Sequence, residues 1–249
     1  MKIVTVRNTK IGSGMPKICV PITGRTSEEI AKQTLDAVEQ LPDLVEWRAD
    51  FFENLFEMNK VREVARKLRE ILGEIPLIFT IRTKNEGGNC DIIPERYQNL
   101  LLEVAKIEEI DLIDVEFFMN ESMKALIKEL QNMGKFVIAS NHHFHETPSR
   151  DRMELILAEM ELAGADLRKL AVMPFSREDV LSLLWVTVLA NSTGEHPVIT
   201  MSMGSLGAIS RVAGEVFGSC VTFGTVGTGS APGQLEISDL KRFLKNLKL

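Results

Sequence analysis

Apolar and polar positions along the chain form two kinds of segment that alternate from one end to the other. Short runs rich in β-branched and other apolar residues are typical of buried strands, whereas longer stretches with apolar residues three and four positions apart are typical of helices. The pattern predicts strands over 17–23, 43–49, 76–82, 111–117, 135–141, 166–173, 197–203 and 220–224. It predicts helices over 28–39, 59–72, 95–107, 122–133, 152–163, 177–190, 207–217 and 237–247.

Eight strands alternating with eight helices in 249 residues predict an α/β fold, a (β/α)₈ TIM barrel that forms a single domain over residues 1–249. The opening segment, residues 1–6, is predicted to be a strand or hairpin that caps the barrel. An open doubly wound sheet is the alternative architecture, but no dinucleotide-binding fingerprint follows the first strand. No linker rich in Pro, Gly or Ser divides the chain.

Composition narrows the classes of partner. The formal net charge is −6 and the pI is about 5.4, so a nucleic-acid partner is not expected, although local arginines could still bind an anionic substrate. The N-terminus lacks a signal-peptide pattern and no apolar run approaches the length of a membrane span, so no membrane partner is expected. Cys19, Cys90 and Cys220 have no metal-ligand spacing and cannot all pair within the chain, which favours a reducing cytoplasm.

Lys169 stands in the middle of the predicted strand 166–173, where burial makes an ammonium group costly. One interpretation is that its amine reaches water or pairs with an acidic residue. The other is an uncharged amine that condenses with a ketone and forms a Schiff base. The residues at the ends of the neighbouring strands bear on this choice, because a barrel places its chemistry at the C-terminal ends of its strands.

The second predicted strand ends with Glu46, Arg48 and Asp50, which strand alternation places on one face. Glu46 and Arg48 could form a structural ion pair or hold hydroxyl groups between an acceptor and a donor. The third strand ends with Arg82. Glu86 follows it in a loop whose two glycines give the backbone freedom to turn, and its carboxylate could orient a base there. The fourth strand carries two acidic residues in an apolar run, at positions 114 and 116.

Three of the four histidines, His142, His143 and His145, follow the fifth strand. A metal site is one explanation, but no recognised ligand spacing surrounds them and adjacent residues of a strand point apart. The other explanation is a general base that acts near neutral pH. Such a base would lie beside Lys169 on the next strand, since neighbouring strands are about 4.8 Å apart.

The last two strands lead to three further candidates. Met201 and Met203 could wall a pocket or fill the barrel. Arg211, in the predicted helix 207–217, could face solvent or turn into the barrel mouth and bind a carboxylate. The glycine-rich loop 224–234 could be a mobile lid or a phosphate cradle.

Taken together and in order, the motifs of this chain resemble those of the type I 3-dehydroquinate dehydratase family, the Schiff-base enzymes of the shikimate pathway. The matching motifs span nearly the whole chain: Pro16-Lys17-Ile18, Glu46-Trp47-Arg48, Phe79-Thr80-Ile81-Arg82, Glu86-Gly87-Gly88, Asn141-His142, Lys169-Leu170-Ala171-Val172-Met173-Pro174, Ile199-Thr200-Met201-Ser202-Met203, Ile209-Ser210-Arg211 and Ser230-Ala231-Pro232-Gly233-Gln234. Each motif is weak alone, but the ordered set is specific.

The resemblance implies that the chain dehydrates 3-dehydroquinate to 3-dehydroshikimate, as a hydro-lyase of aromatic amino acid biosynthesis. It implies a homodimer that needs no metal or cofactor. The implied catalytic residues are Lys169 as the imine-forming lysine, His142 as the general acid/base and Glu86 as the carboxylate that orients it. The implied substrate-binding residues are Glu46, Arg48 and Arg82 around the ring hydroxyls, Arg211 for the carboxylate, and Ser230 and Gln234 in the lid.

Three positions depart from the family pattern. His143 stands where Asp or Asn is usual, so a second titrating group is expected to alter the pH profile. Pro21 stands where relatives often have serine and lacks its hydroxyl. Arg168 replaces a proline or apolar residue, and strand alternation points it away from the face that carries the amine.

Two other functions fit parts of the pattern. A class I Schiff-base aldolase acting on a sugar phosphate would share the lysine and use the glycine-rich loop for phosphate. A metal-dependent hydrolase would be built on His142, His143 and His145. The first predicts competition by inorganic phosphate, and the second predicts inactivation by a chelator.

Overall fold

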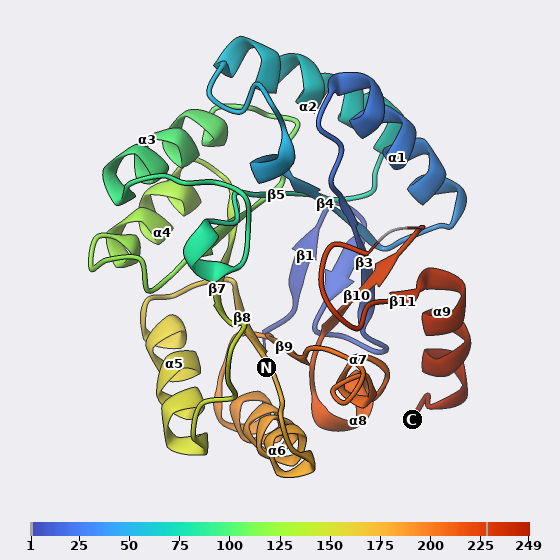
Figure 1. The fold of residues 1–249 in the computed structure, drawn as a ribbon. Helices are drawn as coiled ribbons and strands as arrows, with labels where there is room; N and C mark the ends of the chain where they lie inside the picture. The colour runs from blue at the N-terminus through green and yellow to red at the C-terminus, as the bar shows by residue number, and fades with distance from the viewer. Residues whose placement is uncertain (1, 228) are drawn as a thin grey trace.

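A computed structural model describes residues 2–227 and 229–249 of the chain. Parallel strands form a curled sheet with the order β11-β10-β3-β4-β5-β6-β7-β8-β9, and helices surround it (Figure 1). The sheet closes between β9 and β10, where Cys220 N donates to Val198 O over 2.9 Å and Val198 bridges Ser219. The predicted α/β barrel is confirmed, whereas the single domain stays a prediction.

The elements of the barrel alternate as the apolar pattern predicts. The barrel strands are β3 (Lys17–Ile22), β4 (Leu44–Arg48), β5 (Leu77–Thr80), β6 (Leu112–Glu116), β7 (Phe136–His143), β8 (Leu167–Val172), β9 (Val198–Ser202) and β10 (Val221–Thr225). The outer helices are α1 (Ser27–Glu39), α2 (Met58–Leu72), α3 (Pro94–Ala105), α4 (Met123–Asn132), α5 (Arg150–Leu162), α6 (Arg177–Thr193) and α9 (Ile237–Asn246). Local signals set several starts: Pro94 opens α3, and Ser176 and Asp179 form a capping box at α6.

The predicted helix 207–217 is wrong in one respect, because it is two short helices, α7 (Ile209–Val212) and α8 (Gly214–Phe217). The break falls at Ala213, whose backbone is not helical. Gly214 then packs so closely on its surroundings that a Cβ there would lie 2.7 Å from Ser219 O and 2.8 Å from Pro16. The apolar pattern also did not predict β11 (Leu235–Glu236), a two-residue strand that pairs with the end of β10.

The opening segment is a hairpin of β1 (Val4–Val6) and β2 (Thr9–Ile11), with Met1 outside the described residues. Its buried side chains Val4, Val6 and Ile11 join a cluster inside the barrel that contains Leu44, Ile78, Leu112, Ile138, Leu167, Ile199 and Val221. These partners lie in the first half of their strands, so the hairpin plugs the N-terminal end of the barrel. The opposite end, where the strands finish, is left for the site.

Candidate active site

A pocket lies at the C-terminal ends of the barrel strands. It is lined by eight of the nine site residues predicted from the sequence: Glu46, Arg48, Arg82, His142, Lys169, Arg211, Ser230 and Gln234. The ninth, Glu86, contacts His142. Apolar side chains complete the wall: Phe144, Ala171, Met201, Met203 and Phe223. Both methionines of β9 and its following turn therefore face the pocket.

Lys169 lies on β8 with its side chain only 5% exposed, so its amine does not reach bulk water. Nζ lies 3.3 Å from Asp114 Oδ2 and 3.6 Å from Glu46 Oε1. It also lies 4.6 Å from the ring centroid of Phe223, a cation–π distance. Both acidic partners come from inside the barrel, so the amine is paired at rest and yet faces the pocket.

Asp114, on β6, is the partner that sequence reasoning left without a role. Its Oδ1 accepts hydrogen bonds from Arg82 Nη2 at 2.8 Å and from Ser140 Oγ at 2.6 Å. Burial raises the pKa of Asp114, but Arg82 and Lys169 outweigh that effect and leave the pKa below its ordinary value. The only signal in the sequence was an acidic residue within an apolar strand, and its partners stand on other strands.

Arg82 joins Asp114 to the rest of the polar network. Its Nη1 lies 3.1 Å from Glu116 Oε1 and 3.4 Å from Glu86 Oε2. Burial lowers the pKa of Arg82, but the three surrounding carboxylates more than compensate and raise it well above its ordinary value. Arg82 is thus a permanently charged group in the lining of the pocket.

His142 and Glu86 form a buried dyad, in which His142 Nδ1 lies 2.8 Å from Glu86 Oε2. Burial, followed by the nearby positive charges of Arg82 and Lys169, lowers the pKa of His142 well below its ordinary value. Burial and the neighbouring Glu116 raise the pKa of Glu86 to about 8, although Arg82 opposes them. When Glu86 is ionised, Nδ1–H donates to it and Nε2 carries the lone pair of a base.

The Gly87 backbone explains part of this placement. Its φ is +77°, and a Cβ at this position would lie 2.4 Å from the ring of Phe144. Phe144 in turn stacks on His142, with 6.4 Å between ring centroids and 24° between planes. The glycine therefore lets the loop that carries Glu86 pack directly on the aromatic ring beside the histidine.

Arg211, in α7, is buried rather than solvated, and points into the barrel mouth. Its Nη2 donates to Pro232 O over 2.9 Å, whereas Nε and Nη1 have no hydrogen-bond partner among the described residues. Burial lowers the pKa of Arg211 to about 10. A buried guanidinium with free donors is suited to bind a carboxylate.

The loop after β10 covers the mouth beside Arg211, and its residue 228 lies outside the described residues. Gln234 Oε1 accepts from Ser230 N at 2.7 Å and from Ala231 N at 3.3 Å. Gly204 N donates to Pro232 O over 3.2 Å, which attaches the loop to the end of β9. Since two of its backbone amides are already bound by Gln234, the loop is a poorer phosphate cradle than its glycines imply.

The expectation that Asp50 continues the strand face of Glu46 and Arg48 is wrong. β4 ends at Arg48, and residues 49–51 turn into a short 3-10 helix instead of continuing the strand. This turn brings Asp50 back to Arg48, and the two form a bidentate pair with both distances 2.8 Å. Glu46 instead accepts a hydrogen bond from Thr80 Oγ1 at 2.9 Å, so its pairing is with β5 and Lys169.

The three clustered histidines do not converge on one point. His142 contacts Glu86, His143 contacts Asn141 and Glu146, and His145 is exposed. Within residues 2–227 and 229–249, no group of three or more His, Cys, Asp or Glu side chains is placed to hold a metal ion. The same residues include no helix that is long and apolar enough to cross a bilayer.

Arg168 confirms the expectation from strand alternation. Its guanidinium points out of the barrel, where Nη2 donates to Ala190 O at 3.1 Å and Nε lies 3.0 Å from Glu161 Oε2. Pro21 lies on β3 beside Glu46 in the sheet register. It is not among the residues that line the pocket.

The fold and the pocket define the chain as a barrel enzyme, and comparison with known proteins gives its family. The sequence model of the family described as Type I 3-dehydroquinase matches residues 18–249. A 3-dehydroquinate dehydratase of Clostridium botulinum (strain Eklund 17B / Type B) is 46% identical over 248 residues, which cover 99% of this chain and 98% of the relative. The chain belongs to the type I 3-dehydroquinase family, as its motifs predict.

Solved structures agree with this assignment. The 3-dehydroquinate dehydratase from Geobacillus kaustophilus HTA426 matches with a TM-score of 0.96 and 38% identity, covering 99% of this chain and 96% of that chain. The type I 3-dehydroquinate dehydratase from Clostridium difficile, with covalently modified comenic acid, matches with a TM-score of 0.95 and 41% identity. That match covers 99% of this chain and 98% of the other.

Proposed function

We propose that this protein dehydrates 3-dehydroquinate to 3-dehydroshikimate through a Schiff base on Lys169. The observation that carries the proposal is that three groups line one pocket: the buried Lys169 amine, the His142 ring and the Arg211 guanidinium, two of whose donors have no partner among the described residues. A keto acid needs this combination, because its ketone requires an amine and its carboxylate requires a cation. The description of the Clostridium difficile relative with a covalently modified ligand agrees with covalent chemistry in this family.

The reaction begins with the Lys169 ammonium giving up a proton, for which the Glu46 carboxylate, 3.6 Å from Nζ, is the acceptor. The neutral amine adds to the C3 ketone, and loss of water leaves an iminium at that carbon. The low pKa of Asp114 keeps it ionised beside the nitrogen, so it stabilises the positive charge of the iminium.

His142 then moves the proton. Its Nε2 takes a proton from C2, and the electron pair of that bond passes to the iminium and forms an enamine. His142 returns the proton to the C1 hydroxyl. The enamine electrons shift to form the C1–C2 double bond as this hydroxyl leaves as water, which restores the iminium, and its hydrolysis releases the product and the free amine. General acid/base catalysis of this kind typically contributes about 10²–10⁴-fold. Glu86 holds the imidazole and fixes its tautomer.

The remaining residues bind the substrate. Arg211 binds its carboxylate through Nε and Nη1, the two donors that have no partner among the described residues. Glu46, Arg48 and Arg82 lie around the ring hydroxyls, and Ser230 and Gln234 contact the substrate from the covering loop. All of these steps use side chains of the protein, so a chelator is expected to leave the rate unchanged.

Turnover of 3-dehydroquinate by the purified protein tests this function, followed by the ultraviolet absorbance of the conjugated product. The wild type is expected to form product, and Lys169→Ala to form none above background. Absence of product with the wild type would refute the proposal. Cleavage of a sugar phosphate, inhibited by inorganic phosphate, would instead support an aldolase.

Two statements about the protein in the cell complete the proposal. We expect a homodimer, as the family resemblance implies, which sedimentation equilibrium tests. We expect a cytoplasmic location, in keeping with three cysteines that are all free and buried. Cell fractionation tests the location.

A further inference from the structure

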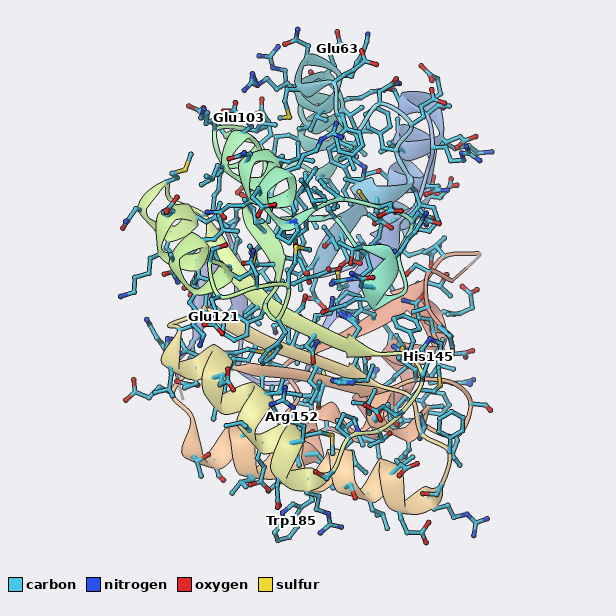
Figure 2. All side chains as sticks on the ribbon, turned by 60° about the vertical axis from the view of Figure 1, so that its left-hand side comes forward. Glu63, Glu103, Glu121, His145, Arg152 and Trp185 are labelled. Carbon is cyan, nitrogen blue, oxygen red and sulfur yellow. The ribbon has the colours of Figure 1, made fainter. Side chains whose placement is uncertain are left out.

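A chain of hydrogen bonds leads from the Glu86–His142 dyad towards the surface through two residues that the mechanism above does not use. Asn141 Nδ2 donates to Glu86 Oε1 over 3.1 Å. Oδ1 of the same amide lies 2.9 Å from His143 Nε2. His143 Nδ1 lies 3.4 Å from Glu146 Oε1, and the Glu146 side chain is 65% exposed. The contacts therefore connect a buried dyad to the solvent side of the loop after β7, where Figure 2 labels the next histidine, His145.

The chemistry of an amide fixes the direction of this chain. Glu86 Oε1 accepts whether the carboxyl is ionised or carries its proton on Oε2 towards His142, so the nitrogen end of Asn141 must face it. The oxygen end then faces His143, and an amide oxygen also only accepts. His143 must therefore carry a proton on Nε2. If it did not, two acceptors would face each other at one end of the Asn141 amide.

Charged and titrating groups reach His143 from several sides. Burial and Arg152 of α5 lower the pKa of His143, and Glu146 raises it, with a net lowering. At neutral pH the ring is then neutral, with its one proton on Nε2. As the pH falls the ring takes a second proton on Nδ1, which faces Glu146. The depression outside Phe144 is lined by the other polar neighbours of His143: Lys84, Asn85, His142, His145 and Glu146.

We propose that His143 is a positioning residue for the dyad, which acts through the side-chain amide of Asn141. Its Nε2–H holds the amide so that the amide nitrogen donates to Glu86. This inference rests on the function proposed above and adds to it a residue that holds the catalytic dyad in position. His143 is not among the residues that line the pocket, so it acts on kcat and not on substrate binding.

Two substitutions at position 143 test the hydrogen-bond donor. His143→Phe keeps a planar ring and removes the donor, whereas His143→Gln places an amide donor close to where Nε2 lies. His143→Phe is expected to lower kcat about fivefold to tenfold, the effect of losing one hydrogen bond between neutral groups, with KM nearly unchanged. His143→Gln is expected to restore most of that kcat. Its pH–rate profile should match that of the wild type, because His143 is uncharged over the range in which Glu86 titrates.

His145→Phe is the matched control, since His145 lies on the same loop and is exposed. It is expected to keep the kcat, KM and pH profile of the wild type. The inference is overturned if His143→Phe has the kcat and pH profile of the wild type. It is overturned as well if His143→Gln is no more active than His143→Phe, because the donor would then not be what matters.

A measurement on the unaltered protein keeps the inference testable if a variant fails to fold. The chain has only four histidines, so nitrogen-15 NMR of the labelled protein can assign each ring. His143 is expected to carry its proton on Nε2 at neutral pH, and a proton on Nδ1 with a bare Nε2 would overturn the inference. This result does not depend on turnover, so it separates failure of this inference from failure of the proposed function.

Discussion

Arg211 is a side chain whose binding role and whose effect on stability point in opposite directions. It is buried in the pocket with a single hydrogen bond, to Pro232 O, and two N–H groups without partners among the described residues. Replacing it with methionine removes the charge and keeps a long apolar stem. We expect Arg211→Met to make the ligand-free protein more stable and to impair the binding of substrate.

The magnitudes follow from the buried charge. Burial lowers the pKa of Arg211 to about 10. A drop of that size corresponds to about 3 kcal/mol, since each tenfold change in proton affinity is about 1.4 kcal/mol. Loss of the hydrogen bond to Pro232 returns about 1 kcal/mol. The free energy of unfolding should therefore rise by about 2 kcal/mol, which is about 4–8 °C in Tm for a chain of this size.

Binding should change far more in the other direction. A substrate carboxylate left without its buried partner costs about 3 kcal/mol, so kcat/KM should fall on the order of a hundredfold, mainly through KM. Calorimetry and steady-state kinetics on one preparation measure both quantities. Arg168→Met is the control, because Arg168 is also buried but is held outside the pocket by Glu161, Ala190 O and His196 O. It should keep its KM. A less stable Arg211→Met protein with an unchanged KM would refute the reasoning.

Three further predictions follow from the dyad and its support. The pKa of Glu86 is about 8, so below this pH its carboxyl group donates to His142 Nδ1 and the proton of the imidazole moves to Nε2. The Nε2 lone pair is then lost, so kcat/KM should rise with pH through about 8. If Glu86→Gln keeps an inflection at this pH, the inflection does not come from Glu86. His142→Gln should lower kcat about 10²–10⁴-fold and still form a borohydride-trapped adduct, so failure to trap would mean that His142 is needed earlier. Gly87→Ala should lower both Tm and kcat, because φ is +77° and the added Cβ meets Phe144; an unchanged thermal scan would show that the loop can relax.

The local pattern of apolar residues was enough to predict the barrel, because each strand and helix shows its own hydrophobic periodicity. The strands are short and apolar on both faces, as buried parallel strands must be, and helices such as α2 bury one stripe: Val61, Val64, Ala65, Leu68 and Leu72. The errors came from tertiary contacts. The helix predicted over 207–217 breaks next to Gly214, which packs against Pro16 from the other end of the chain.

The site residues also divide into those that the sequence could assign and those that depend on tertiary contacts. The barrel rule pointed to the strand ends that carry Arg82 and His142, and the resemblance distinguished His142 from the histidines beside it. Asp114 could not be given a role, because its partners Arg82 and Lys169 follow β5 and lie on β8, respectively, and only the closed sheet brings them together. An ion pair between Glu46 and Arg48 was one of two interpretations, but β4 ends at Arg48 and the turn that follows pairs Arg48 with Asp50 instead.

The central claim is a covalent bond between Lys169 and the substrate. Incubation with 3-dehydroquinate and borohydride, followed by mass spectrometry of the intact chain and its peptides, measures it directly. The account predicts one reduced adduct per chain, located on Lys169 and absent from Lys169→Ala. An unaltered mass in a protein that turns over 3-dehydroquinate, or an adduct on another lysine, would contradict it.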